Sequence, residues 1–117
     1  MEVRTIGEGE RRGLECTSGL QGVGDVLDLV GECAGHGATG VLIAAENLPE
    51  EFFRLKTGLA GEVLQKLQNY GIRLAGVISQ EQAESGRFGE FVREANRGRA
   101  FRFFATRAEA EAWLLAD

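Results

Sequence analysis

The sequence predicts a single α/β domain, residues 1–117, in which helices cover a mixed β-sheet. One observation is a two-sided helical pattern over residues 59–70, followed directly by a nearly apolar segment, Ile72 to Ile78. Such a segment is typical of a strand buried on both faces. A second is that strand-like and helix-like segments alternate in the order β-β-α-β-α-β-α-β-α, which favours parallel crossovers. A third is the length, which suits one domain with one core.

The N-terminal segment predicts a β-hairpin. Residues 2–6 and 13–16 are typical of two short strands, and the intervening Gly7-Glu8-Gly9-Glu10 predicts a turn between them. An antiparallel pair at this end, joined to parallel strands further on, would make the sheet mixed.

The next segment predicts a helix and a buried strand. Asp25 is the expected N-cap, and the predicted buried stripe consists of Val26, Leu29, Val30 and Cys33. The segment Gly35-His36-Gly37 would end this helix. Residues 41–45 are wholly apolar and predict the strand that follows.

The central segment predicts a short helix, a break and a long helix. Asn47 can cap a first turn while Glu50 reaches back to it, and that turn would open a helix carrying the phenylalanines at positions 52–53. Thr57-Gly58 interrupts the pattern, and we expect Thr57 to cap the long helix. A continuous helix is the alternative, since a glycine costs only about 1 kcal/mol inside one.

The long helix has the clearest pattern in the chain. At about 100° per residue, its apolar side chains fall in a single arc and its polar side chains in the opposite one. Gly71 is suited to end it in a left-handed conformation. The predicted apolar arc consists of Leu59, Ala60, Val63, Leu64, Leu67 and Tyr70.

The C-terminal third predicts an irregular segment, a helix, a strand and a last helix. Residues 79–85 are polar and are expected to be irregular, and residues 86–97 have apolar side chains at helical spacing, with Gly98 as the expected cap. Residues 101–105 alternate as in an edge or half-covered strand. Thr106 and Glu109 have the spacing of a capping box for a final helix containing Trp113 and Leu114.

Composition excludes several classes of function. The net charge is −5, which disfavours nucleic-acid or anionic-membrane binding. The sequence has no apolar run of about 18 residues and no signal peptide, so a cytoplasmic location is expected. Cys16 and Cys33 are expected to be free thiols, as is usual in that compartment.

No residue pattern predicts catalysis, a metal or a cofactor. The single histidine, His36, lies at a predicted helix end, where the helix dipole explains it. Cys33 and His36 are three residues apart and could share a helix face, but the third soft ligand, Cys16, has no predicted place beside them. The glycines at positions 19, 22 and 24 do not match a nucleotide-binding fingerprint. We therefore predict no catalytic residue, no metal ligand and no cofactor.

Basic residues gather in the C-terminal third. Arg97 and Arg99 flank Gly98 and could present two guanidinium groups to an anion or to an acidic partner. The alternative is a solvated helix end whose charges suit its dipole. The whole group consists of Arg87, Arg93, Arg97, Arg99, Arg102 and Arg107.

The chain resembles a bacterial domain family of unknown function over nearly its whole length. The phrases TGLAGEVLQK, NYGIRLA and EANRG carry this resemblance. One departure is Ile78-Ser79, where the family is expected to have Gly-Asp soon after the fourth strand. The resemblance implies no activity.

The order of elements also resembles the STAS domain of anti-sigma-factor antagonists. In those proteins a loop after the third strand has a phosphorylated serine followed by glycine at a helix start. Lys56-Thr57-Gly58-Leu59 occupies that place here. The resemblance implies that Thr57 is a phosphorylation site and that Gly58 and the neighbouring helix starts form a docking surface, with an N-cap role for Thr57 as the alternative.

The leading hypothesis is a non-catalytic, cytoplasmic regulatory domain that binds a protein partner, with a homo-oligomer also compatible. The alternative is a small-molecule-binding protein or enzyme whose site lies at the carboxyl ends of the parallel strands, near Asn47, Thr57 and Ser79. A deep cleft with convergent polar groups would favour the second hypothesis. A flat rim with exposed apolar side chains would favour the first.

Overall fold

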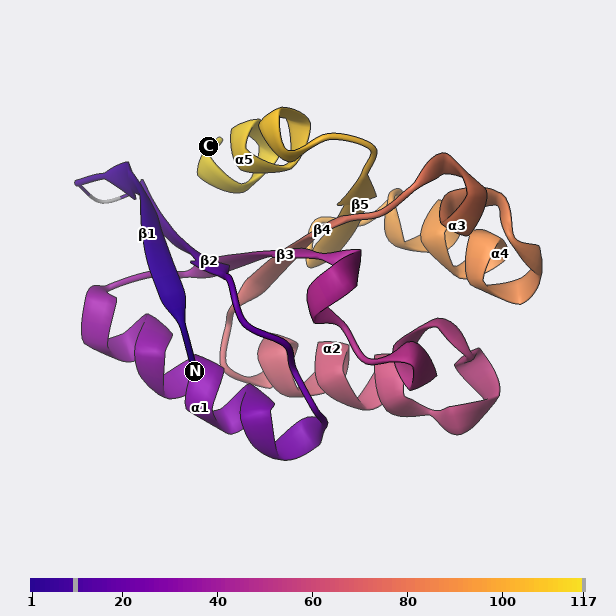
Figure 1. Ribbon diagram of the computed structural model, residues 1–117. Helices are drawn as coiled ribbons and strands as arrows, with labels where there is room; N and C mark the ends of the chain where they lie inside the picture. Colours follow the sequence, from indigo (N-terminus) through magenta and orange to yellow (C-terminus); the bar gives the residue numbers. More distant parts are fainter. Residues whose placement is uncertain (10, 117) are drawn as a thin grey trace.

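A computed structural model of the protein describes residues 1–9 and 11–116. Its centre is a five-stranded sheet whose strands lie side by side in chain order (Figure 1). The first two strands are antiparallel and the remaining pairs are parallel, so the predicted mixed α/β sheet is confirmed. The strands are β1 (Val3–Glu8), β2 (Arg11–Cys16), β3 (Gly40–Ala44), β4 (Arg73–Val77) and β5 (Phe101–Phe104).

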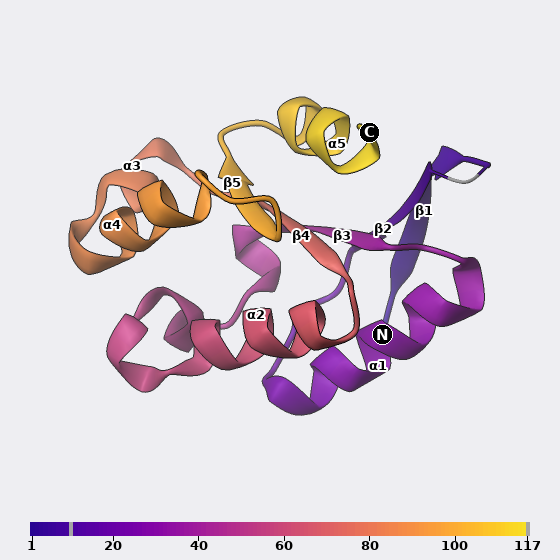
Figure 2. The ribbon, with the colours of Figure 1, turned by 180° about the vertical axis from the view of Figure 1, so that it is seen from behind.

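The helices form two unequal layers over this sheet. The crossover helices α1, α2 and α4 pack on one face, and α5 alone covers the other (Figures 1 and 2). The described helices are α1 (Val23–His36), α2 (Leu59–Asn69), α3 (Gln80–Glu84), α4 (Gly86–Ala95) and α5 (Arg107–Leu115). Short 3-10 helices, η1 (Ala45–Asn47), η2 (Glu50–Phe53) and η3 (Leu55–Thr57), connect β3 to α2.

The larger core lies between the sheet and its three crossover helices. Phe52 is fully buried there, and its ring meets those of Phe88 and Phe103 edge-on at 6.2 and 6.4 Å. Such edge-to-face pairs each add about 1 kcal/mol beyond the burial of their area. Phe52 therefore ties η2 to α4 and β5, which places the η2–η3 segment firmly against the fold.

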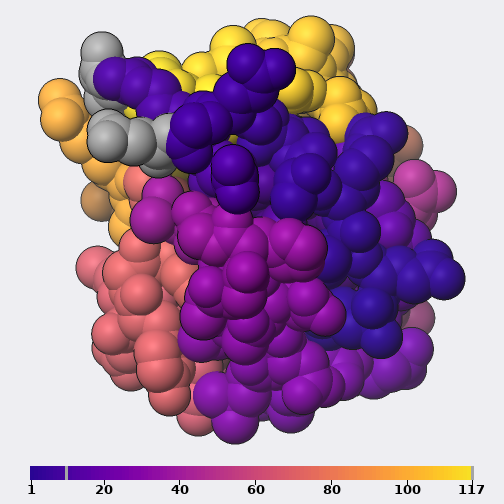
Figure 3. Space-filling view, turned by 90° about the vertical axis from the view of Figure 1, so that its left-hand side faces the viewer, coloured from indigo at the N-terminus to yellow at the C-terminus, as the bar shows by residue number. Residues whose placement is uncertain are grey.

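The smaller core lies under α5. Leu114 is buried against the sheet above Gly13 and Gly40, and a Cβ on Gly40 would lie 2.6 Å from a Leu114 methyl group. The absence of side chains at these strand positions lets the helix approach closely. Viewed from the side of β1, the hairpin lies between α1 and α5 (Figure 3).

Several expectations about element ends are confirmed. The hairpin forms, although β1 includes Gly7 and Glu8, so the turn is shorter than predicted; Glu10 lies outside the described residues. Gly37 ends α1 with a φ of 66°, and Gly71 follows α2 with a φ of 70°. Gly58 has a φ of 79°, so the chain does break there and the continuous helix is ruled out.

The predicted N-caps at Asp25 and Asn47 are wrong. Helix α1 begins at Val23 after Gly22, and Asp25 lies inside its first turn, where its carboxylate accepts a hydrogen bond of 2.7 Å from the backbone N–H of Gln21. Asn47 caps no helix either, because η2 begins after Pro49 without a side-chain cap. Both residues are suitable caps by type, but the helices begin at other positions: α1 follows Gly22 and η2 follows Pro49.

The segment 79–85 is helical, not irregular. Ser79 and Gln82 form a capping box: the Ser79 hydroxyl accepts from the Gln82 N–H, and the Gln82 side chain accepts from the Ser79 N–H. This motif was overlooked because a short polar helix has no apolar periodicity. The next helix ends at Ala95 with Asn96 as C-cap, so Gly98 is not the cap.

Two further details differ from the expected pattern. Tyr70 is 56% exposed because α2 ends at Asn69, which takes its side chain off the buried stripe. Thr106 does cap α5 by accepting from the Glu109 N–H at 3.2 Å, but the predicted capping box is only half formed. The Glu109 carboxylate accepts from the Thr106 hydroxyl at 2.9 Å and not from its backbone N–H. None of the helices in the described residues has the length and apolarity needed to cross a membrane.

Candidate functional site

A groove lined by basic side chains lies beside the start of α2. It has a volume of about 450 Å³ and opens between the η2–η3 segment and the start of α4. We call it the basic groove. Its lining residues are Phe53, Arg54, Leu55, Lys56, Ser85, Gly86, Arg87 and Phe88.

The groove has an apolar floor that is only partly covered. Phe53 and Leu55 are half-buried, and the Phe53 ring packs edge-on against Phe88 with a centroid distance of 5.0 Å. Phe88 itself is buried. Apolar side chains that remain partly open beside a rigid aromatic pair provide surface that a partner can cover.

The charges at the groove are of one sign. Arg54, Lys56 and Arg87 line it, and none of the described residues in its lining is acidic. Arg54 pairs with Glu50 at 2.6 Å, but both side chains are well exposed, and such pairs contribute little. Neither Lys56 nor Arg87 forms an ion pair with any described residue. The groove therefore has unneutralised positive charge on a chain whose net charge is −5.

Thr57 adjoins the groove at the start of α2. Its hydroxyl donates to the carbonyl oxygens of Glu51 and Arg54, both 2.8 Å away, and accepts a 3.3 Å bond from the backbone N–H of Leu59. The N-cap residue of α2 is Gly58, not Thr57 as predicted. Thr57 is nevertheless exposed.

Two of the predicted interaction residues have structural roles at the carboxyl ends of the strands. The Asn47 side-chain amide donates to the Cys16 carbonyl at 3.4 Å, and the Asn47 carbonyl accepts from the Leu20 N–H at 2.8 Å. Asn47 thus joins the end of β3 to the loop after β2. Ser79 caps α3 and lines a small cavity of about 160 Å³ with mostly apolar walls. The polar side chains in its lining are Ser79, Gln80 and Asn96. Of these, Ser79 already bonds to Gln82 and Asn96 to the backbone of Phe103.

Arg97 and Arg99 do not line the basic groove, and the two side chains have different neighbours. Arg97 is 81% exposed and its guanidinium is 3.9 Å from Glu94. Arg99 lines a cavity together with Arg73 and Arg102, away from the lining of the basic groove. The structure therefore does not bring the two arginines together around one anion.

The soft and nucleophilic side chains have ordinary structural environments. Cys16 and Cys33 are free and buried, and burial raises the pKa of the Cys33 thiol to about 11. A thiol protonated at neutral pH is a poor nucleophile. His36 is at the end of α1, 3.5 Å from Glu32. No group of potential metal ligands is assembled within the described part of the chain.

The basic groove was not recognised from the sequence as a site. Its two walls are about 30 residues apart, so no local pattern joins them. The segment Phe-Phe-Arg-Leu-Lys at positions 52–56 is the local hint of this site. It places large apolar side chains directly beside two cations, which are mostly exposed in proteins.

Comparison with known proteins identifies a family and no individual relative. Residues 14–114 match the family model described as "Domain of unknown function (DUF4180)". The match begins in β2 and runs through α5, so it covers the basic groove completely. No curated protein and no solved structure matches the chain significantly. The resemblance to STAS domains therefore rests on the order of elements and the local Thr57-Gly58 match.

Proposed function

The chain belongs to the DUF4180 family, and we propose that it is a non-catalytic regulatory domain that binds a protein partner through the basic groove. The observation that carries this proposal is the half-buried pair Phe53 and Leu55 bordered by Lys56 and Arg87, which lack ion-pair partners among the described residues. This combination provides both an apolar contact and a charge for a partner to match.

The groove defines the chemistry of the partner. An acidic segment with one apolar anchor would cover the Phe53 ring while its carboxylates approach Lys56 and Arg87. Covering apolar surface contributes about 25 cal/mol per Å². The complementary charges mainly raise the association rate and select against other partners.

Thr57 provides a switch for this interaction in the proposed mechanism, as the STAS resemblance implies. Phosphorylation would place about two negative charges beside Lys56 and next to the first turn of α2. The helix dipole tolerates a phosphate there, so the fold would persist. The hydroxyl would lose its bond to the carbonyls of Glu51 and Arg54, a cost of about 1 kcal/mol. The phosphate would then neutralise the groove and repel an acidic partner.

Differential capture followed by titration tests the proposal. The full chain is used as bait beside the double variant Lys56→Glu/Arg87→Glu. A control double variant, Arg93→Glu/Arg97→Glu, makes the same change of charge on α4 and just beyond it. The proposal expects a protein that binds the parent and the control and is lost from the groove variant. The purified partner should then bind Thr57→Glu at least about ten-fold more weakly than the parent.

Two outcomes would contradict this function. A partner that binds the groove variant and the parent with equal affinity would exclude the groove. Equal binding of Thr57→Glu and parent would remove the regulatory role of Thr57 while leaving the groove in place. Circular dichroism of every variant checks that the fold is retained, so that loss of binding is not mistaken for unfolding.

A further inference from the structure

Three arginines converge on a second cavity under the C-terminal end of α5. The cavity has a volume of about 380 Å³ and is lined by Arg73, Arg99, Arg102, Trp113 and Ala116. Arg73 begins β4, Arg102 lies in β5, and Arg99 precedes β5. We call this group the arginine cluster. It has no residue in common with the basic groove.

The register of the sheet explains why these side chains meet. Ala75 of β4 is paired with Arg102 of β5, and Ala75 packs in the smaller core under α5. Because side chains alternate along a strand, Arg73 lies on the same face as Ala75. Arg102 therefore lies diagonally from Arg73 across the two strands, beneath Trp113.

Backbone and aromatic contacts hold two of the guanidinium groups in place. Arg73 donates to the carbonyls of Arg99 and Trp113, both at 3.3 Å, and lies 4.1 Å from the centre of the Trp113 ring. Arg102 donates to the Gly98 carbonyl at 2.7 Å. These bonds use two of the five N–H groups of Arg73 and one of Arg102, so most of the donors are left for a ligand.

The positive charge of the cluster is not balanced by the described residues. None of its arginines forms an ion pair with them. Burial, together with repulsion from Arg102 and Arg99, lowers the pKa of Arg73. The C-terminus of α5 lies nearby, but a helix end is equivalent to only about half a negative charge. A structural role at that helix end explains Arg73 and leaves the other two arginines unexplained.

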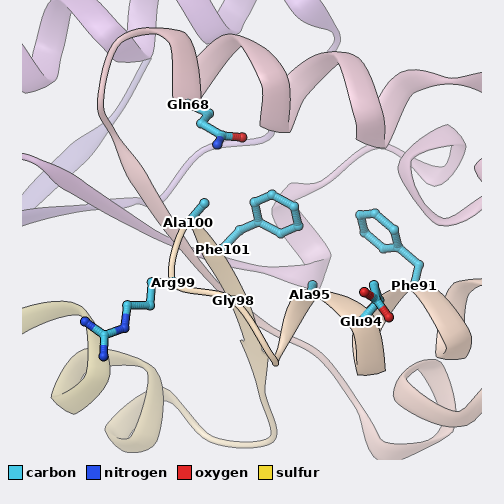
Figure 4. A pocket seen from close by; sticks show the side chains of 8 residues that line it. All are labelled: Gln68, Phe91, Glu94, Ala95, Gly98, Arg99, Ala100 and Phe101. Atoms are coloured by element: carbon cyan, nitrogen blue, oxygen red, sulfur yellow. The ribbon is translucent and has the colours of Figure 1, made fainter.

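A neighbouring groove shows that Arg99 is directed toward this cluster. That groove, of about 540 Å³, is lined in part by Phe91 and Phe101, whose rings stack at 6.0 Å. In Figure 4 the side chain of Arg99 extends away from both phenylalanines and toward the ribbon of α5. Arg99 therefore separates an apolar groove from the arginine cluster and contributes its charge to the latter.

We propose that the arginine cluster binds the phosphate group of a small phosphomonoester. A phosphate monoester has up to two negative charges and three oxygen atoms that accept hydrogen bonds. It therefore suits three guanidinium groups with free N–H donors better than one carboxylate would. The cavity volume of about 380 Å³ lies at the lower end of the usual range for small-ligand pockets. A nucleic-acid backbone would need a row of cations, whereas these cations surround one concavity.

The only tryptophan of the chain, Trp113, is in the cluster and supplies the measurement. Its fluorescence is followed while inorganic phosphate, and separately glycerol phosphate, is added at constant ionic strength. Acetate and chloride serve as ionic controls. The proposal expects a saturable change with both phosphates and none with the controls. Arg99→Gln and Arg102→Gln should each weaken phosphate binding about ten-fold or more.

The neighbouring Arg97 provides the matched control. It is highly exposed and does not line the cavity, so Arg97→Gln should bind phosphate within about two-fold of the parent. Equal weakening by Arg97→Gln, or an equal response to acetate, would show general ion screening and overturn the proposal. Binding of a phosphoserine peptide without any response to glycerol phosphate would overturn it in favour of a protein ligand. Chemical denaturation of each variant confirms that the fold is present.

Discussion

Glu15 of β2 and Arg107 of α5, which are 92 positions apart in the chain, are joined by two hydrogen bonds to one carboxylate oxygen. The Arg107 Nε and Nη2 atoms lie 3.0 and 2.5 Å from Glu15 Oε1. Arg4 of β1 contacts the same oxygen, and Glu111 binds the other side of the Arg107 guanidinium at 2.8 Å. This network connects the start of α5 to the hairpin edge of the sheet.

A double-mutant cycle should detect this connection. We expect Glu15→Gln and Arg107→Gln each to lower the free energy of unfolding by about 1–2 kcal/mol, because the Glu15 side chain is only 16% exposed. The double variant should lose less than the sum of the two. Urea unfolding of the four proteins measures the coupling, and strictly additive effects would show that the two side chains do not interact.

The same pair should make stability depend on acid pH. The hydrogen bond from Arg107 lowers the pKa of Glu15 below its ordinary value of 4.5, against the opposing effect of burial, and Arg4 adds to the lowering. The folded carboxylate therefore holds its proton less tightly than the unfolded one. Its stabilising contribution is present above about pH 4.5 and is lost as the pH falls below that value. A smaller loss of stability in Glu15→Gln between pH 5 and pH 3 would confirm the sign.

Gly40 should be intolerant of even one additional methyl group. A Cβ there would lie 2.6 Å from Cδ1 and 2.9 Å from Cγ of Leu114, which is itself buried. We expect Gly40→Ala to destabilise the fold by about 1–3 kcal/mol through overpacking. The control is Gly31→Ala in α1, where nothing lies within 4 Å and helix propensity predicts a gain of up to about 1 kcal/mol. Thermal unfolding compares the two, and a neutral Gly40→Ala would show that α5 can move.

Ser79 should affect stability as a cap. We expect Ser79→Ala to lower the free energy of unfolding by about 1 kcal/mol, because the Gln82 N–H would lose its acceptor. Thr106→Ala at the start of α5 should cost a similar amount. Neither change should weaken binding of a groove partner. A protein with unchanged stability but weakened partner binding after Ser79→Ala would instead place Ser79 in the interface.

Cys33 should make stability fall at alkaline pH. Burial, with a smaller effect of Glu32, raises the pKa of this thiol from 9.0 to about 11 in the folded state. The unfolded thiol ionises first, so the stabilising contribution is complete below about pH 9 and is lost as the pH rises toward 11. The parent should exceed Cys33→Ala in stability at pH 8, and we expect this difference to shrink by about 1 kcal/mol by pH 10. A difference independent of pH would contradict the shift.

Much of the architecture follows from local patterns in the chain. The apolar stripe of residues 59–67 requires a surface to cover, and the apolar segment 72–78 requires cover on both faces, so a layered sheet is the economical solution. Gly58 and Gly71 mark the ends of that helix because they take left-handed backbone conformations. These features depend on neighbours within about four residues, so they can be predicted from the sequence alone.

Tertiary structure alone decided which distant side chains meet. The basic groove joins residues 53–56 to 85–88, and the arginine cluster needs the pairing of β4 with β5 to place Arg73 and Arg102 under Trp113. Sequence periodicity fixes the face of an element on which a residue lies. Strand register and helix packing fix what that residue faces, and both depend on contacts between segments that no local pattern encodes.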